Sequence, residues 1–205
     1  MYLTKLTLNP RSAQARRDLG DAYEMHRTLV RSFVTDPQTS PPRFLWRLEA
    51  VIDSSQSPTV LVQSEVQGDW AVLDKLPNYL MRPTDTKNVE LARLVRLGRR
   101  YRFLLLANPT VCRKGKRLAL LQQNEQTAWI ERQGERHGFF VQSLVVRGHD
   151  LLNRSSAEKS PISVQRVCFE GFLEVRKTAA FAQALVAGIG PAKAFGCGLL
   201  SVAPC

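Results

Sequence analysis

One succession of strand and helix patterns occurs twice along this chain, and it limits the fold to a small group of α+β arrangements. In the first half, strand patterns cover residues 2–8, 44–51, 59–64 and 100–107. Helical spacing of apolar residues covers 22–33 and 70–76, and a polar connection runs from 11 to 20. The order is β-α-β-β-α-β, which is the order of a ferredoxin-like unit.

The second half repeats this order. Strand patterns cover 117–121, 139–146, 164–175 and 199–203, and helical patterns cover 124–136 and 179–187, with a polar loop at 149–160. We therefore predict an α+β protein of two tandem ferredoxin-like domains with a cleft between them. The first domain is predicted to span residues 1–108 and the second 109–205, because Asn108 and Pro109 interrupt the strand pattern.

The net charge of the chain is strongly positive, and its distribution indicates a polyanionic partner. There are 29 Lys and Arg residues against 18 Asp and Glu, which gives a formal net charge of +11. Eleven cations and two anions lie between Arg82 and Arg117, so this segment alone carries a net +9. A surface that needs only solubility usually mixes both signs. We therefore expect nucleic-acid binding rather than a merely solvated face.

A glycine-rich segment lies between the last helical pattern and the last strand pattern. It contains Gly188, Gly190, Gly196 and Gly198, together with Pro191 and Lys193. Glycine permits tight bends and close approach of the backbone to a ligand, so the segment is suited to handling phosphate. Lys193 precedes the last glycine pair and has no adjoining Ser or Thr, which argues against a nucleotide-binding P-loop. The alternative is structural: Gly188 ends a helix and the other glycines shape a turn.

The four cysteines do not predict a zinc site. Cys112, Cys168, Cys197 and Cys205 form no C-x-x-C pair and no ligand cluster with histidine. The N-terminal residues carry no signal-peptide pattern. The weakly charged stretch after Lys177 is interrupted by Gly-x-Gly-Pro, which argues against a membrane segment. We expect an intracellular protein with reduced thiols, no bound metal and no cofactor.

His26 and Tyr23 are the candidates for proton transfer. They lie about one turn apart on the predicted helix 22–33 and border its apolar stripe, so both could face a cleft. Imidazole titrates near pH ~6.5, and a tyrosine hydroxyl can orient a phosphate or a histidine. The alternative is a histidine at the edge of the core that bonds a backbone carbonyl. His137 and His149 fall in polar contexts and are predicted to be surface residues.

The chain lacks the sequence patterns of the common hydrolases. It has no G-x-S-x-G elbow, no H-E-x-x-H and no spaced acidic triad for divalent metals. A nuclease built on these residues would therefore act without metal. RNA permits this because its own 2′-hydroxyl is the nucleophile. The reaction needs only deprotonation of that hydroxyl, in-line placement and a proton for the departing 5′ oxygen.

Four segments carry a family resemblance: residues 188–204 (GIGPAKAFGCGLLSVAP), 167–171 (VCFEG), 1–5 (MYLTK) and 23–26 (YEMH). Together they resemble the CasE family, the CRISPR RNA-processing endoribonucleases of type I-E Cascade complexes. The resemblance spans both ends of the chain and the order of its segments. It implies tandem ferredoxin-like domains and a cytoplasmic prokaryotic enzyme.

The resemblance also implies an activity and roles for residues. Members of that family bind the hairpin of a CRISPR repeat transcript and cut once at its 3′ base without metal, leaving a 2′,3′-cyclic phosphate and a 5′-hydroxyl. They then retain the hairpin as a Cascade subunit. His26 would be the general base or acid, and Tyr23 would position the scissile phosphate or His26. Lys159 would assist from the long loop of the second domain.

The predicted RNA contacts are basic side chains, with the glycine-rich segment shaping and supporting their cleft: Arg31, Arg93, Arg96, Arg99, Arg113, Lys114, Lys116, Arg117 and Lys193. The basic turn 113–117 is suited to phosphates on both walls of an A-form groove, which favours recognition of a duplex stem by shape. Two alternatives stay open. One is a non-catalytic RNA-binding scaffold of a ribonucleoprotein complex, and the other is an assembly subunit whose charge serves protein contacts.

Overall fold

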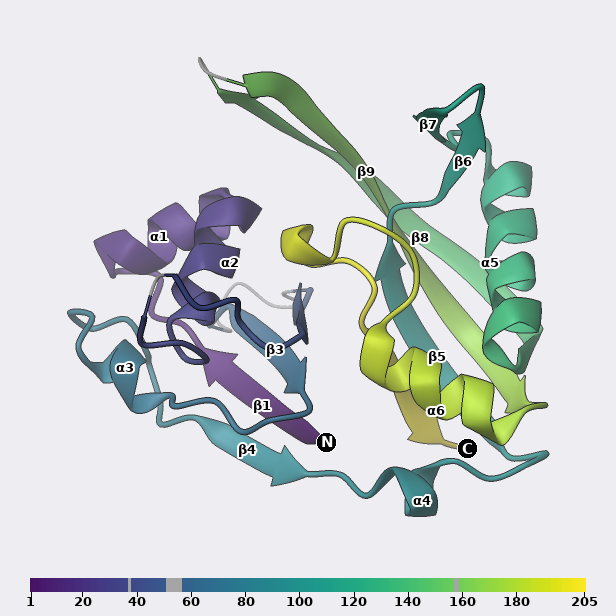
Figure 1. Ribbon diagram of the computed structural model, residues 1–205, viewed down its shortest axis with the longest axis horizontal. Coiled ribbons are helices and arrows are strands. Elements are labelled where there is room, and N and C mark those ends of the chain that lie inside the picture. Colours follow the sequence, from purple (N-terminus) through teal and green to yellow (C-terminus); the bar gives the residue numbers. More distant parts are fainter. Residues whose placement is uncertain (37, 51–56, 157–158) are drawn as a thin grey trace. The chain divides into compact units, whose positions relative to one another are not determined.

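The structure, a computed structural model, describes residues 1–36, 38–50, 57–156 and 159–205; at 149, 153–156 and 159–162 it describes the backbone only. The chain divides into two compact units (Figure 1). The first comprises Met1–Glu90 and Ala194–Gly196, and the second comprises Leu91–Lys193 and Cys197–Cys205. The division therefore falls after Glu90 rather than at the predicted residue 108.

The first unit combines helices with an antiparallel sheet. Its elements in chain order are β1 (Tyr2–Thr7), α1 (Ala13–Gly20), α2 (Ala22–Val30), β2 (Phe44–Leu48), β3 (Thr59–Ser64), α3 (Ala71–Asp74) and β4 (Asp85–Asn88). The strand order is β2-β3-β1-β4, so the first strand lies between the third and the fourth. Val51, which was predicted to end the second strand, lies outside the described residues.

Helix α2 forms as its sequence predicts. The Asp21 side chain accepts a hydrogen bond from the Tyr23 backbone N–H at 2.8 Å and caps the helix N-terminus. Ala22, Met25 and Leu29 are buried at helical spacing, so this face packs into the core of the unit. The helix ends at Val30, three residues before the predicted end.

Helix α1 and strand β4 were not predicted. The segment that was expected to be a polar connection forms α1, and the Ser12 hydroxyl caps it by accepting from the Ala15 backbone N–H. Of its residues, only Ala15 and Asp18 are buried, which leaves too narrow an apolar stripe for periodicity to reveal. Strand β4 is polar throughout and is held by pairing with β1.

The second unit contains a larger antiparallel sheet. Its elements are α4 (Leu91–Leu94), β5 (Arg100–Ala107), β6 (Thr110–Arg113), β7 (Lys116–Ala119), α5 (Gln123–His137), β8 (Phe139–Ser156), β9 (Lys159–Val175), α6 (Thr178–Ala187) and β10 (Leu200–Pro204), and the 3-10 turn η1 (Lys193–Phe195) precedes β10. The strand order is β10-β5-β9-β8. No helix in the described ranges is long and apolar enough to span a membrane.

The strand that was predicted to close the first half opens this second sheet instead. In β5, Leu105 pairs with Phe169 of β9 on one side and with Leu200 of β10 on the other. The buried β5 residues Tyr101 and Phe103 also join the apolar core of the second unit. An alternating apolar pattern identifies a strand but does not identify the sheet that it joins, so this part of the prediction was wrong.

Two further segments of the second half differ from prediction. Residues 117–121 do not open the sheet; β7 pairs with β6 in a separate hairpin, with Arg113 opposite Lys116. The segment 149–160 is not a loop, because β8 and β9 continue through much of it and Asp150 lies opposite Arg166. The Arg166 Nε donates to the Asp150 Oδ1 at 2.8 Å. The ion pair of Asp150 with Arg166 joins the two strands here. The segment was predicted to be a loop because its sequence lacks the alternating apolar residues of a half-buried strand.

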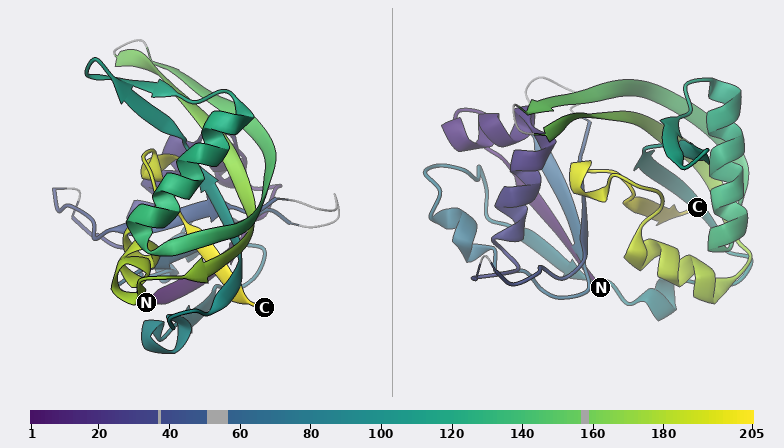
Figure 2. Two further views of the ribbon diagram at one scale, coloured as in Figure 1. Left: turned by 90° about the vertical axis from the view of Figure 1, so that its right-hand side faces the viewer. Right: turned by 45° about the horizontal axis from the view of Figure 1, so that its top comes forward.

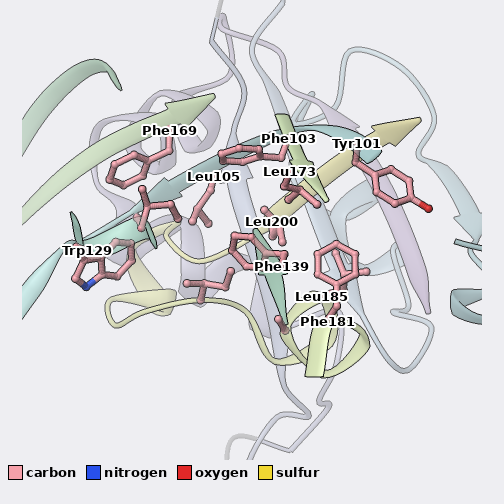
Figure 3. Packing of buried hydrophobic residues seen from close by; sticks show 14 of the residues in the cluster. Tyr101, Phe103, Leu105, Trp129, Phe139, Phe169, Leu173, Phe181, Leu185 and Leu200 are labelled. Atoms are coloured by element: carbon pink, nitrogen blue, oxygen red, sulfur yellow. The ribbon is translucent and has the colours of Figure 1, made fainter. Parts of the chain in front are cut away.

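The core of the second unit lies on one face of its sheet, under α5 and α6. Trp129 of α5 stacks on Phe169 of β9 with ring centroids 5.9 Å apart, and Phe181 of α6 meets the edge of Phe139 of β8 at 6.0 Å (Figure 3). Figure 2 shows the two helices from two directions. This core holds α5 through Trp129 and Ile130 and includes Ile189 at the start of the glycine-rich segment.

Candidate functional site

His26 lies on α2 and ends a row of aromatic rings within the first unit. Its imidazole stacks on Phe44 of β2 with ring centroids 5.0 Å apart and an interplanar angle of 19°. Phe44 in turn stacks on Phe33 at 4.8 Å, and Phe33 meets the edge of the Trp70 indole at 5.7 Å. The orientation of the imidazole is therefore set by ring contact.

The environment of His26 favours the neutral imidazole. Nδ1 is buried and has no hydrogen-bond partner among the described residues, and burial lowers the pKa of His26 below its ordinary value. A protonated ring would hold a buried N–H without an acceptor, which is costly. With Nδ1 buried, Nε2 is the nitrogen that can exchange a proton with a substrate. Near neutral pH the side chain is suited to act as a base.

Tyr23 lies one turn before His26, and 37% of its surface is exposed. The Arg27 guanidinium carbon lies 6.0 Å from the centroid of the Tyr23 ring. Glu24 holds Arg27 through an ion pair of 3.1 Å and also pairs with Arg17 at 3.3 Å. Arg27 was not among the residues predicted for the site. Its spacing of four residues from Tyr23 on a predicted helix is the signal that places it beside the Tyr23 ring.

A buried carboxylate anchors α1 beneath α2. The Asp18 Oδ2 accepts a hydrogen bond from the Tyr79 hydroxyl at 2.8 Å, and its Oδ1 accepts from Gln14 Nε2 at 2.7 Å. The same Tyr79 hydroxyl lies 3.8 Å from the Met25 sulfur. Burial, followed by the charge of Asp18, raises the pKa of Tyr79, so this hydroxyl stays protonated. The contacts fix the helix that carries Tyr23 and His26.

The glycine-rich segment agrees in part with the purely structural role that was the alternative to phosphate binding. Gly188 ends α6, because its backbone N–H donates to the Ala184 carbonyl at 2.9 Å. The backbone N–H of Ile189 then donates to Gly198, and that of Gly198 donates to Leu106 of β5. The segment is therefore an ordered connection between α6 and β10.

The tip of this segment, Ala194–Gly196, belongs to the first unit. Gly196 has a φ of +79°, and a Cβ placed there would lie 3.1 Å from the Trp46 ring. Glycine is therefore required at this position both by backbone conformation and by packing. Trp46 and Phe44 are two residues apart on β2, so their side chains lie on the same face of the strand.

The predicted RNA contacts lie on several elements, and most are exposed. Arg31 is the C-cap that follows α2, and Arg93 lies on α4. Arg96 and Arg99 follow α4, and Arg99 is half-buried against Tyr101. The hairpin β6–β7 carries four more exposed cations, Arg113, Lys114, Lys116 and Arg117, with Lys114 and Gly115 at positive φ in the turn.

Two predicted lysines have different outcomes. Lys193 is half-buried, and its Nζ donates to the Gly190 carbonyl at 2.6 Å, so this side chain supports the glycine-rich segment. Lys159 is the first residue of β9, but its side chain lies outside the described part of the chain. The described residues also contain no cluster of three His, Cys, Asp or Glu side chains that could hold a metal ion.

Comparison with known proteins identifies the family. The family model described as "CRISPR associated protein" matches residues 1–204. The CRISPR-associated endoribonuclease Cse3 of Thermus thermophilus is 40% identical over the full length of both chains. The chain belongs to the Cse3/CasE family of CRISPR-associated endoribonucleases.

A second relative and a solved structure of Cse3 support this assignment. The Cascade subunit CasE of Escherichia coli strain K12 is 29% identical over all of both chains. The solved structure of CRISPR endoribonuclease Cse3 bound to a 19-nucleotide RNA superposes with a TM-score of 0.88, at 39% identity and full coverage of both chains. The α+β fold with two antiparallel sheets is thus that of the Cse3/CasE family.

Proposed function

We propose that this protein is an endoribonuclease that binds CRISPR repeat RNA, cleaves it and serves as a subunit of a Cascade complex. The observation that carries the proposal is the His26 site, a stacked imidazole with a buried Nδ1 and a lowered pKa, on the helix that also carries Tyr23. The full-length similarity to a named endoribonuclease, and to a relative named as a Cascade subunit, supports it.

We also propose that each unit is a ferredoxin-like domain. The strand orders β2-β3-β1-β4 and β10-β5-β9-β8 support this, because in each sheet the first strand of the unit lies between its third and fourth strands. Each unit also follows the order β-α-β-β-α-β, although α1, α4 and the β6–β7 hairpin are additions.

The proposed reaction is an internal transesterification. The neutral Nε2 of His26 accepts the proton of the RNA 2′-hydroxyl, and the 2′ oxygen attacks the adjacent phosphorus. The bond from phosphorus to the 5′ oxygen breaks, and that oxygen takes up a proton. The products are a 2′,3′-cyclic phosphate and a 5′-hydroxyl. Water is not consumed, and the RNA itself supplies the nucleophile.

The remaining residues stabilise charge and hold the RNA. The Tyr23 hydroxyl positions the scissile phosphate, and the guanidinium groups of Arg27 and Arg31 stabilise charge on its nonbridging oxygens. Lys159 assists from the second unit. The exposed cations of the β6–β7 hairpin bind backbone phosphates of a duplex stem, so that the cut falls at the 3′ base of a repeat hairpin and the hairpin product is retained.

A cleavage assay in EDTA tests the proposal. Wild-type protein is expected to cut a repeat hairpin RNA and to leave a cyclic phosphate, whereas RNA with a single 2′-deoxy substitution at the scissile nucleotide stays intact. His26→Ala should lower the single-turnover rate by about 10²- to 10⁴-fold, the range of general acid–base catalysis, while RNA affinity persists. A correct repeat RNA that is bound but left uncut by the wild type would indicate a non-catalytic scaffold.

A further inference from the structure

A basic cavity of about 390 Å³ lies within the second unit, between the C-terminal turn of α5 and the glycine-rich segment. Arg136 and His137 line it from α5, and Arg117 reaches it from β7. Gly190 and Lys193 line it from the glycine-rich segment, and Trp129 of α5 is also among its lining residues. None of these residues takes part in the proposed chemistry of His26.

The charges around this cavity are of one sign. Three basic side chains line it, from Arg117, Arg136 and Lys193, and no Asp or Glu is among its lining residues. Within the described part of the chain, no ion pair joins a carboxylate to Arg117 or Arg136. The negative end of the α5 dipole offsets only about half an elementary charge. The cavity is therefore strongly electropositive.

The pKa of His137 reflects the positive charges around the cavity. The side chain is half-buried, and its pKa is lowered first by burial and then by the charges of Arg136 and Lys193. Neighbouring cations disfavour a further positive charge on the imidazole, which is the effect that a bound anion would reverse.

Contacts within the protein itself hold the walls of the cavity in place, so the cavity is preformed. The Lys193 Nζ donates to the Gly190 carbonyl at 2.6 Å, which holds the ammonium group over the segment. Gly190 has a φ of +79°, and a Cβ placed there would lie 3.1 Å from the Trp129 ring. Since Trp129 is anchored in the core against Phe169, the backbone cannot move away from α5 without loss of packing.

We propose that this cavity binds a phosphate group, supplied by the RNA backbone. The shape and the cations carry the proposal: guanidinium groups bind phosphate oxygens through paired, charge-assisted hydrogen bonds, and the volume admits a phosphodiester with its adjoining sugar. The source of the phosphate rests on the proposed function, whereas the phosphate site itself does not. Free inorganic phosphate has the same chemistry and serves as a separate probe.

The first test follows the His137 ring by NMR. The resonances are assigned with His137→Gln, and the ring is titrated with pH in free protein, with inorganic phosphate, and with a repeat hairpin made uncleavable by a 2′-deoxy substitution. We expect the pKa of His137 to rise in both bound states, and the hairpin to displace inorganic phosphate. If the hairpin binds while His137 titrates as in free protein, the cavity is not a contact for RNA.

The second test uses two arginines of the same helix. Arg136 lines the cavity, whereas the exposed Arg132 does not. Arg136→Gln is expected to weaken hairpin binding about three- to tenfold and to reduce the salt slope by about 0.7–0.9, the value for a single phosphate. Arg132→Gln serves as the matched control and should change neither. Equal affinities of the two variants would overturn the proposal even if cleavage proceeds. Absence of binding and cleavage by the wild type would instead refute the proposed function.

Discussion

At the scale of single residues, the contact between His26 and Phe44 decides what the candidate base can do. The two rings stack at 5.0 Å, and no partner among the described residues accepts a proton from Nδ1. In many catalytic sites a carboxylate orients the histidine and raises its basicity. Here an apolar ring takes the orienting position, so the imidazole is held firmly but stays weakly basic.

Phe44→Leu tests this dependence. Loss of the aromatic ring admits water beside the imidazole, so the pKa of His26 should rise toward about 6.5. Because the reaction uses the neutral base, the acid limb of the single-turnover cleavage rate against pH should move to higher pH. Phe181→Leu is the control, since Phe181 is buried in the second unit and its loss should not move the limb. An unchanged acid limb in Phe44→Leu would show that stacking does not set the basicity of His26.

The sequence indicated His26 and Tyr23 but not their surroundings. The spacing of residues on one helix is visible in a sequence, and so the placement of both residues on α2 was predicted and is confirmed. The stacking of His26 on Phe44 joins a helix to a strand, and no local pattern encodes such a pair. The pairing of Asp18 with Tyr79 spans 61 residues and was missed for the same reason.

At the scale of elements, the glycine-rich segment combines two uses of glycine. Gly188 ends a helix, as the structural alternative required. Gly190 and Gly196 instead allow the backbone to pass directly against the rings of Trp129 and Trp46. The segment was predicted to shape a binding cleft. The packing of Gly190 against Trp129 and of Gly196 against Trp46 restricts the positions that its backbone can take.

Gly196→Ala is expected to destabilise the protein. The positive φ costs about 1–2 kcal/mol for an alanine, and the contact of the new Cβ with Trp46 adds to this cost. Gly115→Ala is the matched control, because Gly115 has a φ of +74° but an added Cβ would meet no atom within 4 Å. Urea unfolding should therefore show a larger loss of unfolding free energy for Gly196→Ala. Equal losses of unfolding free energy in the two variants would mean that the Trp46 ring moves away from the new Cβ at no energetic cost.

Most elements could be predicted, but their partners could not. Apolar periodicity identified α2, α5, α6 and the central strands within a few residues, because these elements bury one face. It missed α1 and β4, which bury little apolar surface. It also placed β5 in the wrong half, since sheet membership depends on contacts distant in the chain.

At the scale of the whole molecule, the net charge of +11 should dominate the affinity for RNA. Each phosphate contact to a duplex releases counterions, so the logarithm of the binding constant should fall linearly with the logarithm of salt concentration. Arg113→Ala combined with Lys116→Ala should reduce this slope by about 0.7–0.9 for each phosphate that the variant no longer binds. Glu131→Ala on α5 is a control of opposite sign and should not reduce the slope. If the double variant keeps the wild-type salt dependence of RNA binding, the β6–β7 hairpin does not contact the RNA phosphates.

The assignment of Ala194–Gly196 to the first unit has a consequence for synthesis. During translation the chain emerges N-terminus first, and domains generally fold as they leave the ribosome. Residues 1–90 emerge early, but Trp46 gains its contact with Gly196 only after more than a hundred further residues have been made. Until residue 196 has been made, the nascent first unit therefore lacks the part of the Trp46 packing that Gly196 supplies.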